Sequence, residues 1–445
     1  MVDKHSFVDW FRSAAPYIHA HRGRTFVLQI AGDVVASESF SHLIHDLALL
    51  NSLAIKLVIV FGARPQIDAL LKERNIAPQY NGALRVTDEQ SFSSVKQAVG
   101  EIKIQIEALL SMGLPNTPMA ESAVKLASGN YVTGRPYGVI NGVDLDLTGR
   151  ARNIEKEIIN NRLEAGEIVL IPPLGYSVTG EVFNLNSIEV AAQVAIDLSA
   201  DKLIMLNNTP ILKNEKGEII RQLTCEQALA KLDPANANNI DEAPSTALAQ
   251  GIKACAAGVK RIHYIDQNID GGILQELFSR DGVGTLLSGK PFDSIHQATV
   301  HDIGGILELI GPLEQQGVLV KRSREKIEVD IDDYIVLVRD GTVIACAALH
   351  AYPEDNVIEL ACIAVHPDYQ NQSKGDMLYK FIESVAIENG VKMLMVLTTQ
   401  TEHWFVERGF TETDISSLPV QKQDIYNYQR NSKALVKQLK VKSET

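Results

Sequence analysis

The chain lacks features that define several classes of protein. Its 445 residues include four cysteines and no Cys-x-x-Cys pair. This spacing favours neither a zinc site nor a disulfide framework. No run of 18 apolar residues and no apolar segment behind the N-terminus is present, so the sequence predicts no membrane span and no signal peptide. We therefore expect a cytoplasmic protein that binds no metal.

An excess of positive charge is also missing. The formal net charge is −13 at pH 7, and a chain without a basic surplus is poorly suited to nucleic acid as its main partner. The Gly-Lys-Ser/Thr of a P-loop is absent. Hydrophobic residues make up 45% of the chain, which is ordinary for a globular protein, and the length allows roughly two to four domains.

Strands and helices alternate in the first part of the chain. An amphipathic helix over 5–20 precedes strands predicted, with helices between them, at 25–30, 56–61, 137–141, 168–171 and 202–206. This order predicts an α/β fold with a mostly parallel sheet covered on both faces. The alternation of strands and helices ends near Leu287, and turn-forming residues follow. We expect one domain over 1–287, a linker over 288–294 and a second domain over 295–445.

A second pattern of strands and helices follows the linker. Strands are predicted at 295–300, 334–339, 342–350, 359–365 and 393–398. A helix over 301–316 follows the first strand, and another follows the fourth. Asp340-Gly341 separates two β-rich runs and is a strong hairpin signal.

The segment from Glu359 to Gly375 has the sequence of a phosphate-ester site. An apolar strand ends at Pro367, and a helix begins about seven residues later. No proline lies between Gln370 and Gly375, so we expect each peptide N–H there to be free to donate. Such amides at a helix N-terminus suit a pyrophosphate. An ordinary strand–loop–helix unit is the alternative.

This segment resembles the pyrophosphate-binding motif of the GCN5-related N-acetyltransferases, whose β–α–β–β–β–α–β order the second pattern also follows. Gln370 and Gly375 match the motif, whereas Ser373 replaces its first glycine, a residue that adopts positive φ at low cost. The resemblance implies that acetyl-CoA is held by Gln370, Asn371, Gln372, Ser373, Lys374 and Gly375. It also implies that backbone N–H groups near Ile363 and Val365 polarise the thioester carbonyl.

Four longer segments resemble bacterial N-acetylglutamate synthases within this family, and the resemblance extends to nearly the full chain. They are 317–325, 359–367, 397–410 and 426–433. The resemblance implies transfer of the acetyl group of acetyl-CoA to the α-amino group of L-glutamate, the first step of arginine biosynthesis.

The resemblance also assigns roles to single residues. Arg322 and Arg430 match the arginines that grip the two carboxylates of glutamate, and the backbone of Cys362 matches the contact to the amino group. Glu359 matches the proposed general base, and Thr398 matches a hydroxyl that helps to protonate the thiolate. Without the match, Glu359 is equally well explained as an ion pair, and both arginines as solvated charges.

The N-terminal part resembles the amino-acid kinases, especially N-acetylglutamate kinase, through Asn81-Gly-Ala-Leu-Arg-Val-Thr. Gln29 lies where those kinases carry a lysine, and Pro65 removes an amide donor from their glycine run. Because phosphoryl transfer depends on positive charge, we expect a sensor and not a catalyst. A working N-acetylglutamate kinase and a non-catalytic amino-acid sensor are the alternative functions.

A further resemblance concerns regulation. The segments 261–266, 274–278 and 282–285 are similar to the arginine-binding segment of arginine-sensitive kinases and synthases. This similarity implies feedback inhibition by L-arginine, bound by Tyr17, Lys202, His263, Glu276 and Gly282. The family also implies a homo-oligomer, a ring of six in which the N-terminal helix links dimers.

Overall fold

The computed structural model describes residues 4–112, 124–207, 217–232, 242–370, 372–424, 426–427 and 432–439. The chain forms two compact units, Met1–Pro291 and Phe292–Thr445. The last strand of the first unit, β16 (Thr285–Ser288), and the first strand of the second unit, β17 (Asp293–Gln297), leave 289–292 between them. The part without regular structure is therefore shorter than the predicted linker.

The first unit contains an eight-stranded, mostly parallel sheet. Only β15 and β16 pair in antiparallel fashion within it. The strand order is β14 (Gln222–Thr224), β16, β15 (Arg261–Asp266), β13 (Lys202–Asn207), β1 (Thr25–Ile30), β2 (Lys56–Phe61), β10 (Ile168–Ile171) and β5 (Leu126–Ser128).

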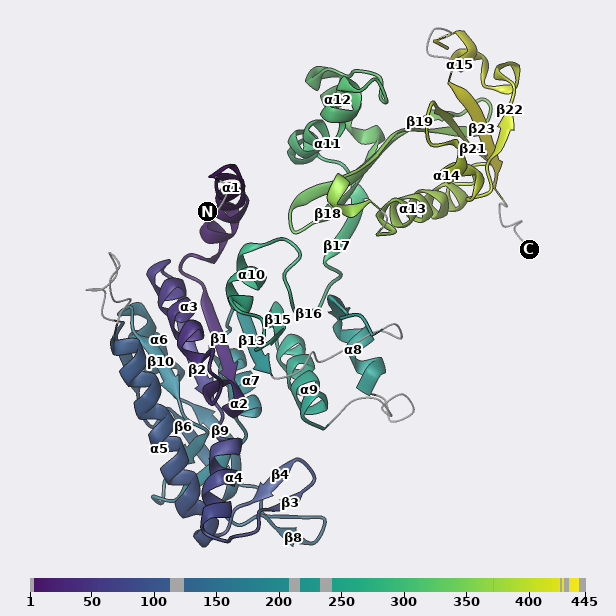
Figure 1. Cartoon of the computed structure of the whole chain (residues 1–445). Helices are drawn as coiled ribbons and strands as arrows, with labels where there is room; N and C mark the ends of the chain where they lie inside the picture. The colour runs from purple at the N-terminus through teal and green to yellow at the C-terminus, as the bar shows by residue number, and fades with distance from the viewer. Residues whose placement is uncertain are drawn as a thin grey trace. The chain divides into compact units, whose positions relative to one another are not determined.

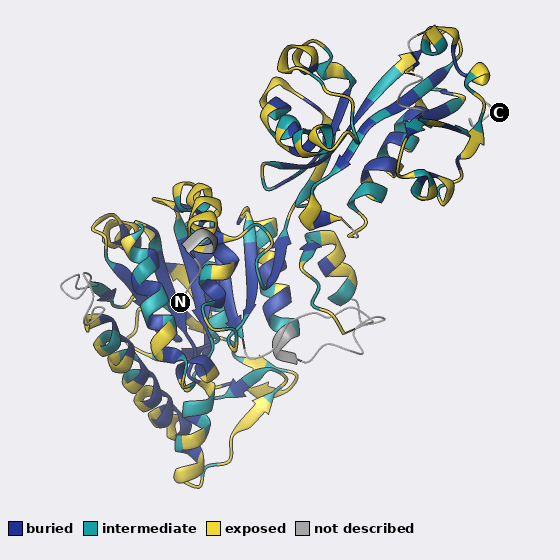
Figure 2. Ribbon diagram, turned by 45° about the horizontal axis from the view of Figure 1, so that its top comes forward, coloured by how far each residue is buried: buried dark blue, intermediate teal, exposed yellow. Residues whose placement is uncertain are grey.

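Both faces of this sheet are buried (Figure 2). On β1, Phe26 and Leu28 face one hydrophobic core and Val27 faces the other. The first core also contains residues of α3 (Phe40–Ser52) and α5 (Glu89–Ser111), and the second contains residues of α7 (Ser187–Asp197) and α9 (Glu242–Ala256). Burial on two faces explains why these strands are continuous apolar runs and not alternating ones.

One predicted strand does not join the sheet. The segment 137–141 contributes only β7 (Val139–Ile140), which pairs with β8 (Val143–Asp144) in a separate hairpin. The backbone has positive φ at Gly138, Asn141 and Gly142, so the chain turns on both sides of this short strand. The four strands β6 (Val132–Pro136), β9 (Thr148–Ile154), β11 (Leu174–Tyr176) and β12 (Val182–Leu185) form a closed barrel that the sequence did not indicate.

The cysteines also differ from expectation. Cys225 of α8 (Cys225–Leu232) and Cys255 of α9 form a disulfide across a sequence separation of 30 residues. The two helices pack against each other, and this proximity cannot be read from cysteine spacing. Cys346 and Cys362 are buried and free.

Among the residues of the N-terminal helix α1 (Lys4–His21) whose burial is described, 7–21, the buried and half-buried ones lie in its second half. Ala14 is 1% exposed, whereas the large aromatic residues of the predicted apolar face, Phe7, Trp10 and Phe11, are between 51% and 55% exposed. The helix therefore uses only part of its apolar face within its own chain.

The second unit contains a seven-stranded sheet between two layers of helices (Figure 1). On β18 (Tyr334–Arg339), Ile335 and Leu337 pack with α13 (Lys374–Glu388), and Val336 packs with α11 (Ile303–Gln315). The strand order is β17, β18, β19 (Thr342–Tyr352), β20 (Val357–Val365), β21 (Met393–Thr398), β23 (Lys433–Gln438) and β22 (Thr411–Thr413).

The strand predicted over 295–300 ends earlier than expected. β17 stops at Gln297, because Thr299 caps the following 3₁₀ turn: its hydroxyl and backbone N–H both bond to Asp302 at 2.8 Å. Such a capping box stabilises a helix start.

The strands β20 and β21 separate within the sheet. β20 pairs with β19 as far as Val365 but pairs with β21 only from Val357 to Leu360. Beyond Leu360, the edge of β20 that faces β21 has no strand partner among the described strands. Backbone amides on that edge are therefore available to a ligand.

Candidate functional site

A cavity of about 230 Å³ lies where β20 and β21 separate. Five residues predicted for the acetyl-transfer site line it together: Arg322, Glu359, Cys362, Ile363 and Thr398. Val365 does not line this cavity and pairs with Ala345 of β19. Arg430 and Asn371 lie outside the described residues.

Glu359 lines this cavity and is buried. It is 3% exposed. One carboxylate oxygen lies 2.8 Å from Nζ of Lys422, and the other accepts a hydrogen bond of 3.2 Å from the hydroxyl of Tyr352. Burial, followed by the charge of Glu359, raises the pKa of Tyr352, so this hydroxyl remains a donor. Both partners fix the carboxylate in position.

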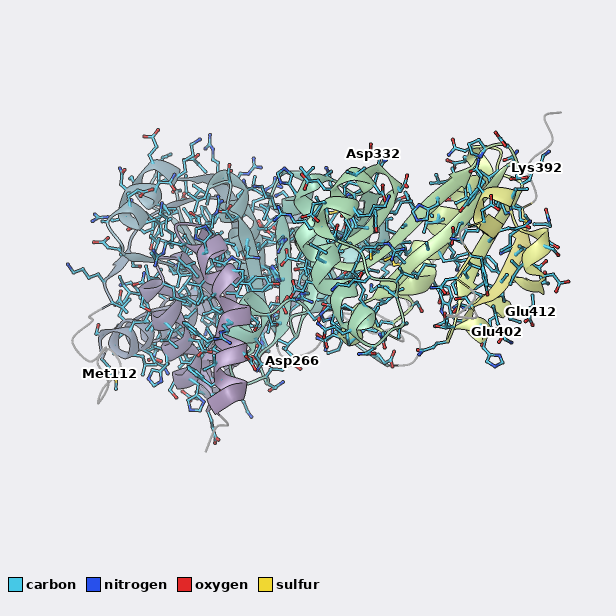
Figure 3. All side chains as sticks on the ribbon, turned by 90° about the horizontal axis from the view of Figure 1, so that it is seen from above. Met112, Asp266, Asp332, Lys392, Glu402 and Glu412 are labelled. Carbon is cyan, nitrogen blue, oxygen red and sulfur yellow. A yellow bond between two sulfur atoms is a disulfide. The ribbon has the colours of Figure 1, made fainter. Side chains whose placement is uncertain are left out.

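Thr398 occupies the end of β21 on the same cavity. Its hydroxyl accepts a bond of 3.1 Å from the backbone N–H of Thr401, and it lies 2.9 Å from the hydroxyl of Thr401. The following helix, α14 (Glu402–Val406), is linked to β23 through Lys433, whose Nζ lies 2.7 Å from Glu402 and 3.8 Å from Glu412. Figure 3 labels the two acids, Glu402 and Glu412. The turn after Thr398 is thus tied to two strands.

Arg322 brings a positive charge to the cavity from the segment between α11 and α12 (Arg324–Val329). Its backbone N–H donates to Glu314 at 2.9 Å, and Nη1 donates to the carbonyl of Val320 at 3.1 Å. These bonds hold the backbone but leave further guanidinium N–H groups to bind an anion. The side chain is half-buried.

Cys362 has an unusual backbone conformation, with φ of 53°. It lies at a register shift between β19 and β20, where the pairing passes from Ala348–Ala361 to Cys346–Ala364. A β-bulge of this kind re-aims the strand next to a site. Its carbonyl accepts a weak bond from the Cys346 thiol at 3.7 Å, so the residue contributes packing and backbone geometry.

The loop before α13 differs from the prediction in one respect. We predicted that every amide from Gln370 to Gly375 is free, and this is wrong. The amide of Gln370 donates to Pro367 at 3.2 Å and that of Gln372 donates to Tyr369 at 3.4 Å. The reason is a 3₁₀ turn over Pro367–Tyr369, to which the next amides bond back. The amides that begin α13 have no intrahelical acceptors.

Three residues of this loop, Ser373, Lys374 and Gly375, each meet a specific structural requirement. Ser373 adopts the left-handed conformation, with φ 58° and ψ 15°, so the position where the motif has glycine keeps positive φ. The ammonium of Lys374 lies 2.5 Å from Asp293, so its side chain is used inside the unit. A Cβ on Gly375 would lie 3.3 Å from Trp404, which explains a small residue there.

We expect Ser373→Gly to stabilise the chain and Ser373→Val to destabilise it. A non-glycine residue in the left-handed region costs about 1 kcal/mol, and a β-branched residue costs more. Glycine should therefore add about 0.5–1 kcal/mol to the free energy of unfolding, while valine should lower it and raise the KM for acetyl-CoA. Urea unfolding and acetyl-CoA kinetics measure both effects. The reverse order of stabilities would contradict the left-handed assignment.

Several residues of the cavity were missed in the sequence. Lys422 belongs to α15 (Val420–Asp424), and Tyr426 donates to the carbonyl of Ser432 at 2.6 Å. His350 of β19 lies 3.2 Å from Asp333. Tyr426 begins one of the segments of family resemblance but was given no role, and no local pattern marks Lys422 or His350, because they reach the cavity only through the folding of distant segments.

The residues predicted to bind arginine form a second group, in the first unit. Nζ of Lys202 lies 3.3 Å from Nε2 of His263, whose Nδ1 lies 2.6 Å from the carboxylate of Glu276. The backbone N–H groups of Val283 and Gly284 donate to the same carboxylate at 2.7 and 2.8 Å. Gly282 has φ of 61°, and a Cβ there would overlap Glu276. The loop therefore requires glycine.

Burial and neighbouring charged or hydrogen-bonding groups shift the pKa values of His263 and Glu276. Burial, and then the charge of Lys202, lowers the pKa of His263. Burial alone would raise the pKa of Glu276, but His263 and the backbone N–H groups of Gly284 and Val283 lower it to about 2. A neutral His263 that donates from Nδ1 and accepts at Nε2 fits both contacts. Tyr17 of α1 is half-buried, and its ring centre lies 6.3 Å from that of His21.

The described part of the chain contains no group of three His, Cys, Asp or Glu side chains placed to hold a metal ion. No helix in the described ranges is long and apolar enough to cross a membrane.

Fold and site together define the class of protein. Residues 24–263 match the amino acid kinase family, and residues 307–410 match the acetyltransferase (GNAT) family. The second unit is thus a GNAT fold, with its cavity between the separating strands, and the first unit has an amino-acid kinase-like fold.

Comparison over the full length narrows the class. The chain is 46% identical over 437 residues to the amino-acid acetyltransferases of Shigella flexneri and Escherichia coli strain K12, covering 98% of this chain and 99% of each relative. It is 47% identical over 430 residues to that of Pectobacterium carotovorum, covering 96% and 98% of the two chains. The chain belongs to the amino-acid acetyltransferase family.

Solved structures agree with this assignment. The chain is similar to N-acetylglutamate synthase from Neisseria gonorrhoeae complexed with coenzyme A and L-arginine, with 36% identity, a TM-score of 0.87 and coverage of 97% and 99%. It is also similar to that enzyme complexed with coenzyme A and N-acetyl-glutamate, with a TM-score of 0.62 and coverage of 98% and 99%. These findings confirm the resemblance seen in the sequence.

Proposed function

We propose that the chain transfers the acetyl group of acetyl-CoA to the α-amino group of L-glutamate, giving N-acetyl-L-glutamate and CoA. One observation carries this proposal: the buried carboxylate of Glu359 and the guanidinium of Arg322 border one cavity where β20 separates from β21. A base and a cation on one cavity suit an acceptor that has an ammonium group and carboxylates.

The proposed mechanism uses the groups on this cavity in sequence. Glu359 takes a proton from the ammonium of glutamate, so that the amine can attack the thioester carbonyl. Backbone N–H groups on β20 near Ile363, which lines the cavity, and near Val365, beyond the cavity lining, stabilise the developing oxyanion. As the C–S bond breaks, the hydroxyl of Thr398 helps to protonate the departing thiolate by passing on the second proton that the nitrogen loses as the amide forms, and the start of α13 holds the pyrophosphate of CoA. Arg322 and Arg430 bind the carboxylates of the acceptor, and Cys362 contributes its backbone.

An assay of acetyl-CoA consumption with a panel of amino acids tests this function. We expect L-glutamate to be the preferred acceptor, because the other amino acids lack either the second carboxylate or its spacing. Product analysis should give one equivalent each of CoA and N-acetyl-L-glutamate. Preference for a different acceptor, or no transfer to any amino acid, would overturn the proposal.

We further propose that L-arginine inhibits the enzyme through the first unit, which acts as its regulatory domain over 1–287. The support is a buried acid, Glu276, beside His263 and the backbone amides of Val283 and Gly284. The carbonyl of Leu277, the residue after Glu276, lies 2.8 Å from Nε2 of His21 of α1. Such an acid can pair with a cationic ligand. Inhibition at a distance requires arginine to bind one conformational state better than another.

The proposal includes assembly and location. The exposed aromatic residues of α1, Phe7, Trp10 and Phe11, support a homo-oligomer in which this helix contacts a neighbouring subunit, and the expected form is a hexamer. A cytoplasmic location is consistent with acetyl-CoA and glutamate as substrates. Sedimentation analysis of the intact chain tests the assembly.

We expect Glu276→Ala and Tyr17→Ala to weaken inhibition by arginine. Loss of a charge-assisted hydrogen bond costs about 1.5–3 kcal/mol, so the half-inhibiting arginine concentration should rise roughly tenfold or more. The ratio of inhibited to uninhibited activity, measured over a range of arginine concentrations, corrects for general loss of activity. The matched control is Glu226→Ala, an exposed acid of α8, which should leave inhibition unchanged.

Unchanged inhibition in the Glu276 and Tyr17 variants would contradict this regulatory site. If arginine then competes directly with glutamate, the effector acts at the acetyltransferase site.

A further inference from the structure

A cluster of three charged side chains joins the start of α13 to the first strand of the second unit. Asp293 is the first residue of β17, which pairs with β18 (Figure 1). One carboxylate oxygen of Asp293 accepts a hydrogen bond of 3.1 Å from Nη1 of Arg339, and the other lies 2.5 Å from Nζ of Lys374. Lys374 is the first residue of α13. Asp293 therefore bridges the sheet and the helix that follows the predicted pyrophosphate loop.

The three side chains are largely buried, so their charges depend on one another. Those of Asp293 and Arg339 are 8% and 7% exposed, and that of Lys374 is 13% exposed. Ions in solution screen such buried pairs much less than exposed ones. A buried charge whose partner is removed is also costly to keep in place. Loss of Asp293 or Lys374 should therefore move the atoms around it.

Two aromatic rings hold Arg339 beside this cluster. Its guanidinium lies 5.1 Å from the ring centre of Phe292 and 5.4 Å from that of Tyr369, which is within the range of a cation–π contact. Tyr369 is 1% exposed and belongs to the 3₁₀ turn before the pyrophosphate loop. The cluster thus contacts this loop at both ends, at Tyr369 before it and at Lys374 after it.

The chain turns sharply just before the helix. Ser373, with its left-handed backbone, directly precedes Lys374, and the side-chain amide of Gln372 donates to the carbonyl of Asp368 at 2.9 Å. The latter bond lies within the loop, whereas the ion pair of Lys374 connects the loop to the sheet. A pyrophosphate held by the first amides of α13 requires accurate placement of these amides. A contact that fixes the first residue of the helix should therefore affect the binding of the cofactor.

The ammonium of Lys374 is used to hold the helix and not to contact the cofactor. A lysine that binds a phosphate as a point charge presents its ammonium to the site. Here Nζ is directed to a carboxylate of the sheet, and little of the side chain is exposed. The contribution of Lys374 to the cofactor site is then its backbone N–H at the start of α13.

We infer that Asp293 and Lys374 form a positioning pair for acetyl-CoA. Their ion pair fixes the first turn of α13, so that its amides bind the pyrophosphate, and Arg339 holds Asp293 in place. The inference rests on the proposed binding of acetyl-CoA at the start of α13. It adds to that site a residue outside the pyrophosphate loop, at a sequence separation of 81 from Lys374.

Calorimetric titration of the full chain with CoA and with 3′-dephospho-CoA tests this pair. Both ligands carry the pyrophosphate, and only CoA carries the 3′-phosphate. We expect Asp293→Asn and Lys374→Met each to weaken both ligands about fivefold or more, because each leaves a buried charge without its partner. Lys374→Arg keeps the charge and should bind within about twofold of the parent. The KM for L-glutamate should stay parental in all three variants, which general damage to the unit would not allow.

The double variant shows whether the two residues act as one pair. Asp293→Asn combined with Lys374→Met should bind CoA within about twofold of the weaker single variant, because both changes remove the same contact. If Lys374 instead contacts a phosphate directly, Asp293→Asn releases its ammonium and should tighten CoA. The matched controls are Asp332→Asn and Lys380→Met, at exposed residues of the same unit, which should bind like the parent.

The outcomes separate this inference from the proposed function. Parental CoA affinity in Lys374→Met, tighter binding by Asp293→Asn, or a loss in Lys374→Met that disappears with 3′-dephospho-CoA would overturn the positioning pair alone. If Asp293→Asn does not fold, Lys374→Met and its rescue by Lys374→Arg still test the pair. A parent chain that binds no CoA would overturn the proposed function and the positioning pair together.

Discussion

Glu359→Gln should lower kcat about 100-fold or more, the usual contribution of a positioned general base. Glutamine keeps the size of the side chain and can still accept from Tyr352, but it cannot take a proton from the substrate ammonium. The loss should become smaller as the pH rises, because more of the substrate amine is then deprotonated without help. Steady-state kinetics across pH 6–10 would measure both effects.

A matched control separates chemistry from general damage. Glu328→Gln changes an exposed acid of α12 in the same unit and should leave kcat and its pH profile unchanged. Because Lys422 loses its charged partner in Glu359→Gln, the free energy of unfolding should be measured for both variants. A folded Glu359→Gln enzyme with the parental pH profile would exclude Glu359 as the base.

Arg322→Ala should raise the KM for glutamate strongly and leave the KM for acetyl-CoA nearly unchanged. Truncating one partner of a charge-assisted pair costs about 2–4 kcal/mol, which corresponds to roughly 30-fold or more in affinity. Since Arg322 is half-buried, we expect the lower part of this range. Initial rates at varied concentrations of each substrate separate the two effects.

The neighbouring arginine provides the control for this variant. Arg324→Ala removes an exposed charge two residues away and should change the glutamate KM less than twofold. Arg430→Ala is expected to behave like Arg322→Ala, because glutamate has two carboxylates to bind. Parental glutamate kinetics in both Arg322→Ala and Arg430→Ala would remove these residues from the acceptor site.

Prediction from the sequence succeeded where a segment is governed by its own pattern. The strands 25–30 and 56–61 were predicted with their observed bounds, because apolar runs buried on both faces have few alternatives. The prediction for the segment 137–141 failed because Gly138, Asn141 and the following Gly142 make turns that interrupt the strand. The barrel and the disulfide of Cys225 with Cys255 were missed because both join segments that are distant in the sequence.

In the candidate site, too, features set by local sequence were predicted, and features that join distant segments were not. The strand that carries Glu359 and Cys362 and the strand that ends at Thr398 were found from local sequence and family resemblance. Lys422 was not found, although it pairs with Glu359 at 2.8 Å, because the two residues are separated by 63 in the sequence (422 − 359) and no motif contains both. The two paired amides of Gln370 and Gln372 depend on a 3₁₀ turn that composition does not reveal.

The sequence by itself determined the two α/β units, their order and the family, because hydrophobic periodicity and motif residues are local properties that survive without coordinates. Only the tertiary structure decided which side chains share a cavity. It brought Lys422 and Tyr352 to Glu359, gave Ser373 its left-handed conformation, and left Oε1 of Gln29 and Nη1 of Arg85 without a hydrogen-bond partner among the described residues. Such convergence depends on how distant segments pack, since hydrogen bonds and ion pairs form wherever the fold brings their atoms within reach.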